Sequence, residues 1–126
     1  MSVFKLLLIG LGGALGSITR HALAKAVQDG LHSMFPFGTL LINIVGSFFL
    51  GIVYMLAVRN AAFSENWRLF LGVGFCGGFT TFSAFALENF NLLDQKLVGT
   101  SVLYIAVSVV AGILALGAGV WVSRFL

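Results

Sequence analysis

The stretch GFCGGFTTFSAF, Gly74–Phe85, decides how this sequence folds. It places a glycine pair and three hydroxyl side chains inside a segment that is otherwise apolar enough to cross a membrane. Gly77 and Gly78 weaken a helix, because glycine loses more backbone freedom on folding than other residues. The side chains of Thr80 and Thr81 can satisfy backbone groups that an interruption frees. We therefore expect a broken helix here, with a kinked helix and glycine packing as the alternative.

The composition is that of a membrane protein. Of 126 residues, 60 % are hydrophobic and 9 % are charged, and the mean hydropathy is +1.08. A soluble domain carries about 25 % charged residues, which its water-facing surface requires. The net charge of +3 is small and the seven basic residues form no run, so nothing favours nucleic acid as a partner. We expect the lipid bilayer to surround the chain.

Four stretches are long enough to cross ~30 Å of hydrocarbon, which takes about 20 residues. We expect an all-α bundle forming one transmembrane domain over residues 1–126, with spans at about 3–27, 37–58, 67–93 and 97–122. Small residues spaced four apart favour close helix packing, within the chain or between subunits. These rows are Gly12 and Gly16; Ser47 and Gly51; and Ala111, Ala115 and Gly119.

The distribution of basic residues specifies orientation only weakly. Four spans place both chain ends on one side of the membrane, and the excess of Lys and Arg orients such a protein. The side of the membrane that holds both chain ends has four basic residues: Lys5, Arg59, Arg68 and Arg124. The opposite side has two, Lys25 and Lys96, or three if the Arg20 side chain reaches it. We therefore expect insertion in both directions and assembly as an antiparallel homodimer.

Polar side chains within spans are costly, and each is a candidate for function. Asn43, towards the middle of the second span, offers two donors and one acceptor, and its alternative role is an interhelical hydrogen bond. Phe82 and Phe85 share a helix face, which Phe75 and Phe79 extend upstream. Phenyl rings have a positive edge that can meet an anion, although such a stripe also serves as core or lipid contact.

Three further groups complete this set. Tyr104 and Ser108 lie four residues apart on the fourth span and can continue a polar track. Arg20, near the far end of the first span, either raises the local anion concentration or snorkels to the surface. A broken helix exposes carbonyl oxygens that suit Na⁺, or points helix N-termini at an anion. The role of Glu88 stays open.

Several classes of protein are disfavoured by what the sequence lacks. The first three-quarters of the first span has no carboxylate, which argues against a proton-coupled cation exporter. No TVGYG-like potassium filter occurs. Ser/His/Asp, Cys/His and metal-spaced clusters are missing, so we expect no enzyme. A non-conducting assembly factor, whose glycine seams bind another protein, remains an alternative to a channel.

Three motifs together resemble the Fluc (CrcB) family of small fluoride channels: GGALGS with a following arginine in the first span, GTLLINIVGSFFLG in the second and GFCGGFTTFSAF in the third. The resemblance covers nearly the whole chain. It implies a dual-topology antiparallel homodimer in the inner (plasma) membrane, with two narrow pathways. Such proteins passively export cytoplasmic fluoride and so protect the cell from its toxicity.

The resemblance also implies residue roles. A structural Na⁺ at the dimer interface would be held by main-chain carbonyls of Gly77 and Thr80 from both subunits. Phe82 and Phe85 would present ring edges to fluoride, and Asn43 would donate to it. The remaining residues expected on the fluoride pathway are Thr39, Thr81, Ser83, Tyr104 and Ser108, with Arg20 at the mouth.

This sequence departs from the family pattern at two places. Ala84 stands where the third-span motif usually has a second threonine. The helical steps after Ser108 are Gly112 and Leu116, which carry no hydroxyl. The outer part of the pathway is therefore expected to use water or backbone groups.

Overall fold

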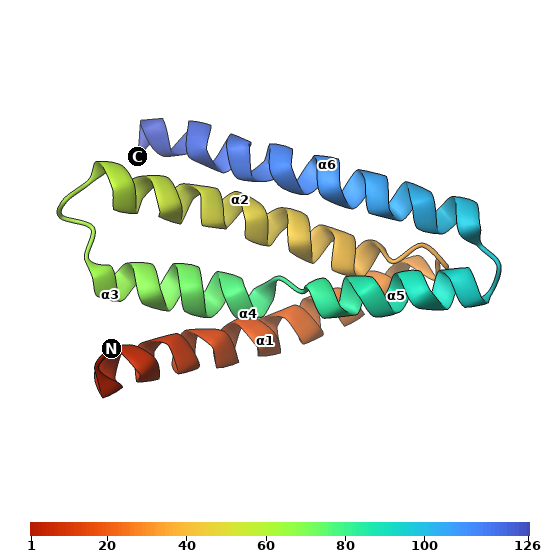
Figure 1. Cartoon of the computed structure of the whole chain (residues 1–126), viewed down its shortest axis with the longest axis horizontal. Helices are drawn as coiled ribbons and strands as arrows, with labels where there is room; N and C mark the ends of the chain where they lie inside the picture. Colours follow the sequence, from red (N-terminus) through yellow and green to blue (C-terminus); the bar gives the residue numbers. More distant parts are fainter.

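The computed structural model describes residues 1–126 and contains only helices and their connections. Four segments are long and apolar enough to cross a membrane: Val3–Leu31, Phe37–Arg59, Glu65–Asp94 and Val98–Phe125. The predicted all-α, four-span class is confirmed. Successive spans run in opposite directions, and both chain ends lie at the same end of the bundle (Figure 1).

The first two spans are continuous helices. α1 is Val3–Leu31, four residues longer than expected, and ends where His32 adopts a left-handed conformation with φ 48°. α2 is Phe37–Arg59 and starts directly after Pro36. The Gln28 side chain holds the short connector: its amide nitrogen donates to the Ser33 and Phe35 carbonyls, and its oxygen accepts from the backbone N–H that opens α2.

The third span is divided into pieces. It comprises α3 (Glu65–Trp67), the π-helical segment η1 (Arg68–Cys76), α4 (Gly77–Phe79) and α5 (Phe82–Asp94). Thr80 (φ −80°, ψ 155°) and Thr81 (φ −150°, ψ 117°) are extended, so the helix breaks in the middle of the span, between α4 and α5 in Figure 1. The predicted break is therefore present, although its position differs from the glycine pair.

Gly77 and Gly78 are helical, and Gly78 serves helix packing. A Cβ atom at Gly78 would collide with the backbone of Gly13 on α1, and one at Gly16 would collide with the backbone of Phe75. Glycine at these positions lets α1 and the third span approach backbone to backbone. The two threonines, and not the glycines, take the extended conformation.

α6 (Val98–Val122), followed by the short turn η2 (Ser123–Phe125), packs along α2 and runs in the same direction (Figure 1). Gly51 lies against the backbone of Leu116, and Gly119 lies against the backbone of Phe48. The small residues spaced four apart thus pack α2 against α6 within one chain. A role for them in an oligomer stays a prediction.

The α2–α6 contact yields a matched pair of variants on one helix. A Cβ at Gly119 would meet the Phe48 backbone, whereas one at Gly117 meets nothing within 4 Å. We expect Gly119→Ala to lower the free energy of unfolding by about 1–3 kcal/mol, as overpacking does. Gly117→Ala should not lower it, because alanine favours the helix. Thermal unfolding in detergent measures both, and equal loss of stability would contradict this packing.

Candidate functional site

The break in the third span is held by one side chain from α2. Asn43 Nδ2 donates to the Thr81 carbonyl oxygen at 3.2 Å, and the Thr81 N–H donates to Asn43 Oδ1 at 2.8 Å. Both backbone groups of an unwound residue are thereby satisfied in a setting where water is scarce. The carboxamide therefore replaces the helical hydrogen bonds that the break removes. Asn43 lies nearer the start of α2 than its middle, where we had expected it.

The two threonines complete this arrangement locally. Thr80 donates through both its backbone N–H and its Oγ1 to the Cys76 carbonyl, at 3.0 and 2.8 Å. Thr81 Oγ1 accepts the Ala84 N–H at 3.1 Å and so caps the N-terminus of α5. Ser83 Oγ lies 3.3 Å from the same Thr81 oxygen. α5 thus begins within the membrane with its partially positive end at the break.

Arg20 reaches the same break from α1. Its Nε donates to the Gly78 carbonyl at 3.1 Å, and Ser17 Oγ lies 3.5 Å from that oxygen. The side chain is therefore turned towards the break, whereas snorkelling would take it to the surface. A guanidinium at the carbonyl end of α4 also complements the helix dipole.

A cleft of about 270 Å³ opens beside the break, and we call it the vestibule. Its walls come from α1, α2 and α5, and it brings together Arg20, Thr39, Thr81 and Glu88. These residues span almost 70 positions of sequence, from the first span to the third. Ten residues line the vestibule and only two of them are hydrophobic, which is unusual for the interior of a membrane bundle.

Glu88 joins three helices, a role that the sequence did not reveal. The Thr39 hydroxyl donates to its Oε2 at 2.9 Å, and the Tyr104 hydroxyl donates to its Oε1 at 3.2 Å. No basic side chain lies within ion-pairing distance of the Glu88 carboxylate. Tyr104 is fully buried with its hydroxyl already engaged. The only sign of this role in the sequence was a carboxylate late in the third span.

The phenylalanines divide into two separate pairs. Phe82 is 79 % exposed, and its ring centroid lies 5.7 Å from that of Phe85, which in turn contacts the ring of Tyr104. On the other side of the break, Phe75 stacks on Phe79, which is buried. The expected continuous stripe is therefore wrong, because the extended threonines change the direction of the side chains.

Ser108 lies beyond Tyr104 along α6, away from the vestibule. Its Oγ is buried and has no hydrogen-bond partner. A buried hydroxyl left unpaired costs about 1–3 kcal/mol. The same residue lines an open cleft with Ser47 and Gly112, between α2 and α6. Ser108 therefore offers a hydroxyl without a partner beside an open cleft.

The residues Gly77 and Thr80 line a different cleft from the vestibule. Both residues line a cleft of about 320 Å³ between α2 and η1, together with Tyr54, Arg68 and Cys76. Outside the helical ladders, neither carbonyl oxygen accepts a hydrogen bond. A Cβ at Gly77 would touch only one atom, at 4.0 Å, so the cleft is open there. These neutral oxygens are suitable ligands for a hard cation such as Na⁺.

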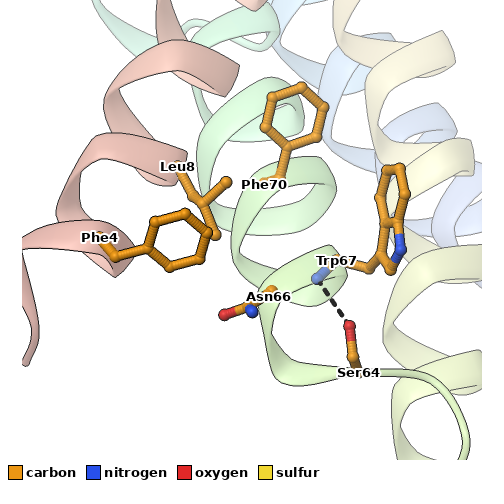
Figure 2. A pocket seen from close by; sticks show the side chains of 6 residues that line it. All are labelled: Phe4, Leu8, Ser64, Asn66, Trp67 and Phe70. Carbon is orange, nitrogen blue, oxygen red and sulfur yellow. Dashed lines mark hydrogen bonds between the residues drawn. The ribbon is translucent and has the colours of Figure 1, made fainter.

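A further groove lies at the end of the bundle where the chain starts. Figure 2 shows its lining: Phe4 and Leu8 from α1, and Ser64, Asn66, Trp67 and Phe70 from the start of the third span. It is mainly apolar and contains none of the predicted site residues. This position, with an exposed tryptophan, is typical of the membrane–water boundary.

Comparison with known proteins agrees with this architecture. Residues 7–120 match the family model described as CrcB-like protein, Camphor Resistance (CrcB). The chain belongs to the CrcB family. A relative from Azobacteroides pseudotrichonymphae, named fluoride-specific ion channel FluC, is 40 % identical over 96 % of this chain and 97 % of the relative. A relative of the same name from Leptospira interrogans is 45 % identical over 94 % of each chain. A third, from Caulobacter vibrioides, is 42 % identical over 95 % of each.

Membership in the CrcB family confirms two predictions from the sequence. The resemblance read from the three motifs is correct, and it extends over almost the full chain. The curated relatives are named as ion channels and not as enzymes, as expected. The roles of individual residues in this CrcB-family chain stay predictions.

The pairing of Asn43 with Thr81 predicts a local effect. Asn43→Ala leaves the Thr81 N–H and carbonyl without partners, at a cost of about 1–3 kcal/mol for each buried group. We expect the Thr81 amide to exchange its hydrogen faster in lipid nanodiscs, as measured by mass spectrometry. Asn66→Ala is the control, because that side chain is exposed and makes no hydrogen bond. Unchanged protection at Thr81 would contradict the pairing.

Proposed function

We propose that this protein is a fluoride-selective channel through which fluoride leaves the cytoplasm passively, protecting the cell from fluoride toxicity. The observation that carries the proposal is the break at Thr80–Thr81, held by Asn43, in a chain whose relatives are named fluoride-specific ion channels. Entry of fluoride as its weak acid and trapping as the ion supply the gradient. The inner membrane is the expected location in a bacterial cell.

The chemistry of the site suits a small, strongly hydrated anion. Conduction requires that the pore replace the hydration shell and still release the ion. Asn43 has a second Nδ2 hydrogen beyond the one given to Thr81, and the hydroxyls of Thr81 and Ser83 lie at the break. The Thr39 hydroxyl lines the vestibule and donates to Glu88. Neutral donors of this kind attract fluoride without the deep binding of a fixed cation.

The aromatic and electrostatic groups add to this path. Phe82 and Phe85 lie on α5 directly after the break, where their ring edges can face a passing anion. Tyr104 and Ser108 extend the path along α6. Arg20 lines the vestibule and raises the local anion concentration at the mouth.

The working unit in this proposal is an antiparallel homodimer with two pathways. One support is the small difference in the number of basic residues between the two ends of the bundle. Another is Phe82, whose side chain is 79 % exposed on a single chain and could contact a second copy. The open cleft at Gly77 and Thr80 gives further support, since its carbonyl oxygens can meet those of a partner. A Na⁺ held there supplies fixed positive charge near both pathways without moving with the anion.

Fluoride efflux from liposomes tests the proposed function. Purified protein should release fluoride far faster than chloride when a fluoride electrode monitors efflux. Phe82→Ala should slow efflux about tenfold, the factor that corresponds to 1.4 kcal/mol of lost ion stabilisation. Phe90→Ala is the matched control, because Phe90 is also exposed on α5 but lies two helical turns from the break. Chloride efflux as fast as fluoride efflux would refute the proposal.

Topology reporters test the antiparallel assembly. A C-terminal fusion that is active only in the cytoplasm and one that is active only outside should both give signal, because each orientation is equally populated. Adding three lysines after Leu126 should bias insertion, lower the yield of dimer and reduce efflux. A single orientation in the unmodified protein would rule out dual topology.

A further inference from the structure

We infer that Ser47, on α2, supplies the hydroxyl that α6 lacks beyond Ser108, so that the fluoride path crosses from α6 to α2. This inference deepens the proposed function and rests on it. It assigns a coordinating role to a residue whose spacing had indicated only helix packing.

The register between α2 and α6 leads to Ser47. These helices run in the same direction. Thr39 and Tyr104 both donate to Glu88, and we call this pair the first level. Two helical turns further, Ser47 Oγ lies 4.0 Å from the point that a Cβ would occupy at Gly112. The offset in residue number is the same in these two pairs. Asn43 and Ser108 share that offset, and we place them as the second level, between the other two.

Each of these three levels carries polar side chains, and the hydroxyls of the first level donate to Glu88. The first has Thr39 and Tyr104, and the second has the Asn43 amide and the unpartnered Ser108 hydroxyl. At the third, α6 contributes Gly112, which has no side chain, and α2 contributes Ser47. Ser47 forms no hydrogen bond within the chain and lines the same open cleft as Ser108.

The next level closes the path between the helices. Gly51 there lies against the backbone of Leu116, so no space for an ion remains between α2 and α6. The outer wall of the cleft is apolar, formed by Val109, Ile113 and Leu116. Ser47 is therefore the last hydroxyl that an ion meets before it leaves this groove, and its loss leaves Ser108 as the only donor in the cleft.

The missing side chain at Gly112 provides a rescue design. Ser47→Ala should lower fluoride efflux from liposomes about tenfold, as expected when one hydrogen bond to a charged group is lost. Gly112→Ser in that background returns a hydroxyl to the same level from α6, and should restore most of the rate. Gly112→Ala fills the same space without a hydroxyl and should restore nothing. Size-exclusion elution and thermal stability of each variant confirm that it folds as the unaltered protein does.

The outcomes separate this inference from the proposed function. If the unaltered protein conducts fluoride and Ser47→Ala conducts equally well, Ser47 does not coordinate the ion and only this inference is overturned. Rescue by Gly112→Ala as strong as rescue by Gly112→Ser would likewise overturn it, because packing alone would then explain the loss. If the unaltered protein releases no fluoride, the proposed function fails and the inference fails with it.

Discussion

The pair of hydrogen bonds between Asn43 and Thr81 is the interaction on which this structure depends. A helix can unwind inside a membrane only where protein groups replace the lost backbone hydrogen bonds. Asn43 replaces both at once, and Arg20 and Ser17 engage the Gly78 carbonyl that the break also frees. Without the carboxamide, the Thr81 N–H and carbonyl would lack partners at the break.

The break then determines where polar chemistry can lie. It places the start of α5 within the membrane and turns Phe82 outwards, while Phe79 stays buried. It also opens the vestibule next to Thr81 and leaves the Gly77 and Thr80 oxygens free on the opposite cleft. One local departure from helical geometry thus leads both to the polar vestibule and to the free carbonyl oxygens of the second cleft.

The sequence predicted the four spans, the existence of the break and the family, because apolar length and the third-span motif are local signals. It placed the break within Gly74–Phe85 without showing which residues unwind: Gly77 and Gly78 stay helical, and Gly78 lies against the backbone of α1. The contacts of Glu88 with Thr39 and Tyr104 join three helices, and no local pattern encodes such a meeting. The same holds for the α2–α6 register, which depends on packing along the full length of both helices.

Solid-state NMR of the protein in lipid bilayers, with threonine, glycine and asparagine labelled, tests directly whether Asn43 holds a break at Thr80 and Thr81. We expect Cα and Cβ chemical shifts typical of extended backbone at Thr80 and Thr81, helical shifts at Gly77 and Gly78, and a cross-peak between the Asn43 side chain and the Thr81 amide. Helical shifts through both threonines, with no contact to Asn43, would contradict it.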